Sequence, residues 1–198
     1  VFKANIDEFG SVLPVITDLR NPNLLDRHWS EITKLLQHNI LTDANFCLGT
    51  LLERNATTHA HAINIISFKA RQEAILQEQL TKVQTIWSEL AFPLLPYKNQ
   101  KDMHILGSLD DILIVLDESI VTLASILGSH YVEPLRREAV ELSHQLSQFQ
   151  LVLEEWTLCQ RQWMHLESIF SWQDIIRQLP DEFTLFWLVT KGFELTMR

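Results

Sequence analysis

One segment, residues 142 to 170, constrains the fold of this chain more than any other. Its key positions recur at alternating steps of four and three residues, which places them on one face of an α-helix. They are Leu142, Leu146, Phe149, Leu153, Trp156, Gln160 and Trp163, with Gln160 the single polar member. A helical face of this length needs other elements to cover it. The segment therefore predicts a helical element with an interaction or mechanical role.

A second long amphipathic helix is predicted from about 59 to 92. Thr57 or Thr58 is a suitable cap for its start, and Pro93 ends it because proline has no amide donor. The first long helix is expected to begin at about Pro134 and to run to about 166. Shorter helices are predicted after Asn21-Pro22-Asn23 to about Asn39, from Asp43 to before Asn55, from Ser108 to about Leu127, from Ile175 to Leu179, and from Asp181 onward.

Three further segments have their own expectations. Residues 1 to 23 contain Gly10, Pro14 and Pro22, so we expect at most a short helix there. Residues 94 to 106 place a polar centre between two apolar flanks and predict a loop or a small β-hairpin. The helix from Ser108 is apolar on nearly all sides, which indicates a central position, and Gly128 is its expected C-cap.

We therefore expect an all-α protein with one small β-hairpin near 94–106. Because two of the predicted helices have about 30 residues each, we expect an elongated, rod-like bundle. The chain has 198 residues, of which 46% are hydrophobic, and this is enough to bury a real core. Within one continuous helical domain over 1–198, two subdomains are expected, at about 1–106 and about 107–198.

Charge and hydropathy argue against two classes of partner. The formal net charge is -9, which is unfavourable for binding a phosphate backbone, so we expect no nucleic acid partner. No run of ~18 uninterrupted apolar residues is present, so we expect no membrane span. Cys47 and Cys159 lie far apart, which favours a reducing compartment. The sequence starts at Val1 without a signal-peptide pattern, and we interpret it as an excised fragment of a longer protein.

Catalytic and ligand-binding motifs are missing from the sequence. The five glycines form neither a phosphate-binding loop nor a dinucleotide-binding turn. His59 and His61 would lie about 200° apart on a helix, so they do not converge on a metal. Adjacent carboxylates such as Glu154 and Glu155 point in different directions. We predict no catalytic, cofactor-binding or metal-binding residue, while an enzyme that uses the histidines or cysteines stays a third alternative.

The six tryptophans are more informative. An indole ring buries a large apolar area and requires one hydrogen-bond acceptor. Their number favours core packing, and an exposed docking face for another protein is the alternative.

Several sequence blocks resemble the linker region of dynein heavy chains. The blocks are Asp26-Arg27-His28-Trp29, Ala70-Arg71-Gln72-Glu73 with Leu80 and Trp87, and Pro96-Tyr97 leading to Leu106-Gly107-Ser108-Leu109-Asp110-Asp111. The most specific block is Trp156-x-x-x-Gln160-x-x-Trp163-x-x-Leu166-Glu167-x-Ile169-Phe170, and Leu179-Pro180 continues it. We take the following as the structural signature of the resemblance: His28, Trp29, Glu73, Trp87, Trp156, Gln160, Trp163, Leu166, Phe170 and Pro180.

The resemblance implies a mechanical role. In this family the linker is a helical arm that joins the tail to a ring of AAA+ modules and bends during the ATP cycle to drive movement along microtubules. It implies that this chain is roughly the N-terminal half of the arm and contains no cofactor, since ATP and Mg would bind the ring. The implied partners are the AAA+ ring of the same heavy chain, the microtubule indirectly, and dynein intermediate and light chains through the tail.

One departure from the family pattern concerns the last predicted helix. Family members carry a Val-Asp pair followed by Trp, whereas this sequence runs from Phe186 to Phe193 without an acidic residue. The departure leaves the contacts of that helix open and indicates a divergent member, similar to axonemal or ciliary heavy chains rather than to the main cytoplasmic one. A static, spectrin-like interaction scaffold without a motor is the alternative function.

Overall fold

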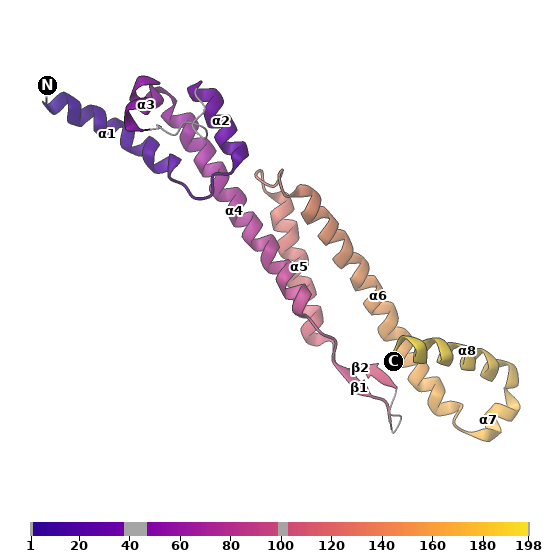
Figure 1. The fold of residues 1–198 in the computed structure, drawn as a ribbon. Helices are drawn as coiled ribbons and strands as arrows, with labels where there is room; N and C mark the ends of the chain where they lie inside the picture. Colours follow the sequence, from indigo (N-terminus) through magenta and orange to yellow (C-terminus); the bar gives the residue numbers. More distant parts are fainter. Residues whose placement is uncertain (1, 38–46, 99–102, 198) are drawn as a thin grey trace. The chain divides into compact units, whose positions relative to one another are not determined.

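The structure is a computed structural model that describes residues 2–37, 47–98 and 103–197 (Figure 1). Its contacts group the chain into two units, one of residues 1–81 with 128–136 and the other of residues 82–127 with 137–198. We describe each unit by itself. The two subdomains expected at about 1–106 and 107–198 stay a prediction from the sequence, as does the rod-like shape.

The described residues confirm an all-α fold with one small hairpin (Figure 1). Residues 94–106, expected as a loop or hairpin, form a two-stranded antiparallel sheet in which Leu95 faces Ile105. The α-helices and strands are α1 (Phe2–Leu19), α2 (Asp26–Leu36), α3 (Leu48–Glu53), α4 (Ala60–Glu89), β1 (Leu94–Pro96), β2 (His104–Leu106), α5 (Asp110–Gly128), α6 (Arg136–Ile169), α7 (Gln173–Gln178) and α8 (Pro180–Thr196).

The expectation for residues 1 to 23 was wrong, because α1 has 18 residues and contains Pro14 within it. Proline removes one backbone hydrogen bond from a helix interior. The helix nevertheless has a buried stripe at Val12 and Val15, with Ile16 and Leu19 packed beside it. Pro14 itself is exposed. The burial of this stripe therefore outweighs the local preference of proline to end the helix.

The core of the first unit collects apolar residues from α1, α2, α3 and the first part of α4. Ile32 and Ile63 are completely buried there, and Trp29 packs against the cluster while half-buried. α2 ends at Leu36 because Gln37 takes a left-handed conformation with a φ of 50°. The buried members of the cluster are Val12, Val15, Leu24, Ile32, Leu36, Leu51, Ala56, Ile63, Ile66 and Ala70.

Several predicted helix ends differ from the structure. A 3₁₀ turn over Ala56–His59 precedes α4, so neither expected threonine caps it, and α4 ends at Glu89 instead of about 92. Gly128 is the last residue of α5 and its φ is not positive, so the expected glycine C-cap was wrong. The expected cap Asp43 lies outside the described residues.

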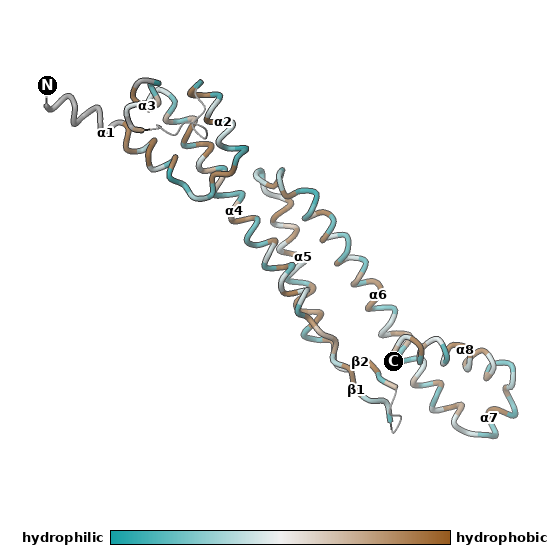
Figure 2. Tube along the Cα trace, viewed as in Figure 1, coloured by the Kyte–Doolittle hydropathy of each residue, from teal (hydrophilic) through white to brown (hydrophobic). Residues whose placement is uncertain are grey.

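Helix α5 is less central than its composition predicts. Hydrophobic residues cover most of its turns (Figure 2), and Ile112, Leu116 and Leu123 are buried. Val121, however, is 69% exposed and Ile114 is exposed as well. One face of α5 therefore packs within its unit, and the opposite face exposes Ile114 and Val121 beside acidic residues such as Asp117 and Glu118.

Candidate functional site

The best-defined set of polar contacts joins the hairpin to α6 through Gln160. The backbone N–H of Leu106 donates to Gln160 Oε1 at 2.8 Å, and Gln160 Nε2 donates to the carbonyl oxygen of Leu106 at 2.9 Å. Gln160 is only 8% exposed. Its side-chain amide thus satisfies both backbone groups of one strand residue.

The sheet register explains why Leu106 needs this partner. The hairpin hydrogen bonds run from the Tyr97 N–H to the Met103 carbonyl and from the Gly107 N–H to the Pro93 carbonyl. Leu106, opposite Leu94, lies between these bonds, so its backbone groups point away from β1. Gln160 therefore occupies the place of a third strand at this single position.

A second set of contacts fixes the hairpin to the next turn of α6. The ring centroids of Tyr97 and Trp163 lie 5.0 Å apart, and the Tyr97 hydroxyl donates to Glu167 Oε2 at 3.1 Å. Lys98 forms an ion pair with the same carboxylate oxygen. Burial, followed by the hydrogen bond to Glu167, raises the pKa of Tyr97, and the hydrogen bond to Glu167 raises the pKa of Lys98. The neutral phenol and the charged amine are the stable forms at neutral pH.

The aromatic rings of α6 and α8 form a stack around Phe193. The centroid of its ring lies 4.5 Å from that of Trp163 and 5.2 Å from that of Trp156, with interplanar angles of 11° and 4°. Trp163 Nε1 donates to the hydroxyl of Thr190 at 3.0 Å, so the buried indole has its acceptor. Trp163 therefore contacts the hairpin on one side and α8 on the other.

The end of α4 joins the same unit through Trp87. Its indole Nε1 donates to Ser119 of α5 at 2.9 Å, and its ring packs edge-to-face on Phe149 of α6 with centroids 5.2 Å apart. Gln84 also donates to Glu138 of α6 at 2.7 Å. Trp87 thus joins the last turn of α4 to the middle of α5 and the middle of α6.

A buried polar cluster in the first unit unites two of the sequence blocks. His28 is completely buried, and its Nε2 lies 3.0 Å from Oε2 of Glu73, which is 3% exposed. Because His28 Nδ1 accepts from the Leu25 N–H at 3.1 Å, Nε2 carries the proton and donates to Glu73. Arg27 also pairs with Oε2, while Oε1 has no hydrogen-bond partner among the described residues.

The remaining signature residues of the sequence lie at the ends of α6 and α8. Phe170 is buried and stacks on Phe186 at 5.1 Å, Leu166 is exposed, and Pro180 occupies the first position of α8. The structure brings Trp156, Gln160 and Trp163 together around the hairpin and α8. Sequence reasoning did not identify Phe193 as their partner, although its aromatic type and position in a helix were visible.

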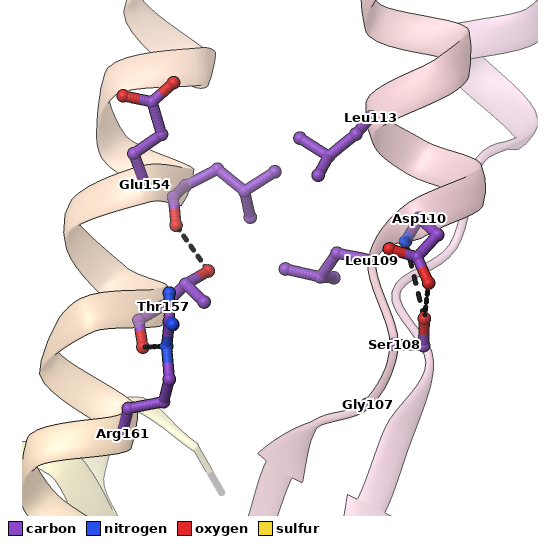
Figure 3. Close-up of a pocket in the computed structure, with 9 residues that line it drawn as sticks. Gly107, Ser108, Leu109, Asp110, Leu113, Glu154, Thr157 and Arg161 are labelled. Atoms are coloured by element: carbon purple, nitrogen blue, oxygen red, sulfur yellow. Dashed lines mark hydrogen bonds between the residues drawn. The ribbon is translucent and has the colours of Figure 1, made fainter.

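Two cavities adjoin α6. One of about 340 Å³ lies between the first turns of α5 and the middle of α6, where Leu109 and Leu113 face Thr157 and Arg161 (Figure 3). The other, of about 660 Å³, lies between the C-terminal half of α6 and α8 and is almost entirely apolar.

The described residues contain neither a candidate membrane span nor a candidate metal-binding cluster. None of the helices there combines the length and the apolar composition that crossing a bilayer requires. The same residues hold no group of three or more His, Cys, Asp or Glu side chains placed to bind a metal ion.

Comparison with known proteins gives a family match over the whole chain. A family model described as "Dynein heavy chain, N-terminal region 2" matches residues 1–198. Dynein axonemal heavy chain 6 of Homo sapiens is 41% identical to this chain over 99% of its length. Dynein axonemal heavy chain 1 of Mus musculus is 37% identical over 91% of the chain, and dynein axonemal heavy chain 3 of Homo sapiens is 30% identical over 98% of it. The matched part is 4% to 5% of the length of these relatives.

Proposed function

Because this chain belongs to the dynein heavy chain family, we propose that it is a force-transmitting part of a dynein motor. Specifically, it forms part of the linker arm, a lever that connects the tail to the AAA+ ring and moves during the ATP cycle. In this proposal the chain performs no catalysis. ATP and Mg bind the ring, the microtubule is contacted only indirectly, and intermediate and light chains bind through the tail.

The observation that carries the proposal is the junction around Trp163. The hairpin, α6 and α8 meet at this one residue through the Tyr97 contact, the Phe193 stack and the Thr190 hydrogen bond. Three elements fixed to one buried indole resist sliding against each other, since any displacement breaks stacking and hydrogen bonds together. A unit that resists internal sliding passes on an applied force with little deformation, which is what a lever needs.

The names of the relatives support a proposal for the location. The relatives compared above are dynein axonemal heavy chains. We therefore assign the protein to the axoneme of a cilium or flagellum. A tagged heavy chain that localises elsewhere in ciliated cells would argue against this assignment.

The lever role is tested by Trp156→Ala in a complete heavy chain. Trp156 stacks on Phe193 while half-buried, so its removal loosens the contact between α6 and α8. We expect microtubule gliding speed to fall more than ATP turnover. The control is Trp187→Ala, because Trp187 is half-exposed on α8 and stacks on no other aromatic ring in the described part of the chain.

Equal losses of gliding and ATP turnover in the Trp156 variant would contradict the lever role. Folding of the variant must be verified first by circular dichroism, because removal of a large aromatic side chain from a core costs ~3–5 kcal/mol. A static interaction scaffold, in contrast, predicts that neither motor rate changes in a folded variant.

A further inference from the structure

The segment at the start of the hairpin is apolar, extended and exposed. It reads Phe92-Pro93-Leu94-Leu95-Pro96, and β1 forms its last three residues. Leu94 is 54% exposed, Leu95 is 50% exposed, and both prolines are exposed as well. Because successive residues of a strand point to opposite faces, the exposure of both leucines means that neither face of β1 is fully covered in the described part of the chain.

The outer edge of β1 is open too, and its backbone offers mainly hydrogen-bond acceptors. Hairpin hydrogen bonds join Tyr97 to Met103 and Gly107 to Pro93. The residues between these positions, Leu94 and Pro96, therefore direct their backbone groups away from β2. Because proline has no N–H, this edge presents both carbonyl oxygens but only the amide of Leu94. Such an edge suits a partner that donates hydrogen bonds to carbonyl oxygens.

The two prolines restrict the segment to extended conformations before any partner binds. Each proline fixes its own φ at about −65°. The residues before them, Phe92 and Leu95, are kept out of the helical region by the proline rings. Polyproline II lies in the same allowed region as a β-strand, so little rearrangement separates the two conformations. A partner that reads polyproline II therefore pays a small ordering cost here.

The polyproline II conformation has about three residues per turn, which sorts the segment into three ridges. The two prolines share one ridge, and Phe92 and Leu95 share the next. Leu94 and Tyr97 share the third ridge, and Tyr97 is the buried residue that fixes the hairpin to α6. The first two ridges are therefore the ones available to a partner.

We propose that this segment is a docking site for an SH3 domain of a partner protein. The aromatic-lined groove of an SH3 domain binds P-x-x-P segments in the polyproline II conformation. Pro93 and Pro96 have this spacing, and each follows a large apolar residue. Phe92 is 43% exposed and also packs on Phe149, so Leu95 supplies more of the free apolar surface.

The inference concerns the exposed side of the hairpin and does not rest on the lever role. A heavy chain whose linker served only as a static scaffold would bind the same domain. Lys98 forms an ion pair with Glu167, so we assign recognition to the two apolar ridges and not to this lysine.

The test is binding of the complete heavy chain to an array of purified SH3 domains, with WW domains on the same array. Leu95→Ser and Leu94→Ser are a matched pair of variants, because the two adjacent leucines have nearly equal exposure. We expect at least one SH3 domain to bind the wild-type chain. Leu95→Ser should weaken that binding by about tenfold, and Leu94→Ser should leave it within about twofold.

A double substitution tests the proline spacing. Pro93→Ala combined with Pro96→Ala should also weaken binding by about tenfold. The control combines Pro22→Ala with Pro134→Ala, at exposed prolines outside the segment, and should bind as the wild-type chain does.

Three results would overturn the proposal. The first is the absence of binding to every SH3 domain, or binding to WW domains alone. The second is an equal loss in the Leu94 and Leu95 variants, which would show that the ridges are not distinguished. The third comes from a synthetic peptide of residues 90 to 98, which should compete with the wild-type chain for the groove. Failure of this peptide to compete would contradict the proposal, and its result does not depend on the folding of any variant.

Discussion

Replacing Gln160 with leucine should detach β2 from α6 without emptying the space that Gln160 fills. Leucine is similar in size, but it can neither accept from the Leu106 N–H nor donate to the Leu106 carbonyl. Each such hydrogen bond contributes about 1 kcal/mol net. Because Leu106 is only half-buried, water can reach the freed groups, so we expect the loss to be the net value of the two bonds, a free energy of unfolding lower by ~2 kcal/mol.

Amide hydrogen exchange measures this effect at the residue concerned. A loss of ~2 kcal/mol corresponds to exchange of the Leu106 amide that is about thirtyfold faster. Exchange of the Tyr97 amide, which donates to Met103 inside the hairpin, should be accelerated less than that of the Leu106 amide, because its own bond does not involve Gln160. The melting temperature should fall by ~4–8 °C for a chain of this length.

The matched control is Gln150→Leu on the same helix. The Gln150 side chain donates to exposed Glu154 at 3.2 Å, so its loss should change stability by less than about 0.5 kcal/mol. The reasoning is refuted if the Leu106 amide exchanges at the same rate in the wild-type chain and the Gln160 variant. It is also refuted if the two glutamine variants lose equal stability.

Three further perturbations test the other contacts. Glu73→Ala should lower the free energy of unfolding in urea by ~1–3 kcal/mol, because it leaves the buried N–H donor of His28 without an acceptor. Glu31→Ala, which removes an exposed ion pair with Lys69, should lower it by ~1 kcal/mol or less, and equal losses would contradict this account. Trp163→Ala should lower the free energy of unfolding by ~3–5 kcal/mol and abolish the near-ultraviolet circular dichroism signal of the stack. Trp187→Ala, at an exposed side chain, should have neither effect. The pKa of Tyr97 lies above its ordinary value of 10.0, so the stability contributed by the neutral phenol is complete below pH 10.0 and is lost as the pH rises further. In thermal unfolding from about pH 8 to 11, the Tyr97→Phe variant should therefore lose less stability than the wild-type chain. An identical pH profile for the two proteins would argue against a buried phenol.

Periodicity predicted the helices well where their packing is regular. The 3.6-residue period gave α4 and α6 to within a few residues of their ends, because most of each helix is decided by its buried stripe. It failed for α1, where Pro14 was given more weight than the Val12 and Val15 stripe. It also failed at Gly128, since a glycine near a helix end indicates a C-cap only if its backbone becomes left-handed.

The candidate site was predicted in part. Trp156, Gln160 and Trp163 were identified from their spacing and from the family resemblance, and the structure places all three at one junction. The partner of Gln160 could not be predicted, because it is the backbone of Leu106, 54 residues away, and backbone groups are the same at every position of a sequence. The pairing of His28 with Glu73 likewise depends on how two helices cross.

The Gln160 contact also has a consequence for the edges of the hairpin. A β-hairpin has two open edges, and an open edge presents unpaired N–H and C=O groups on which another strand can add. Pro96 lacks an amide donor on the β1 edge, and Gln160 occupies the groups of Leu106 on the β2 edge. Each edge of this short sheet thereby offers fewer free backbone groups to an incoming strand, so the same glutamine that holds the hairpin in place also disfavours strand addition at Leu106.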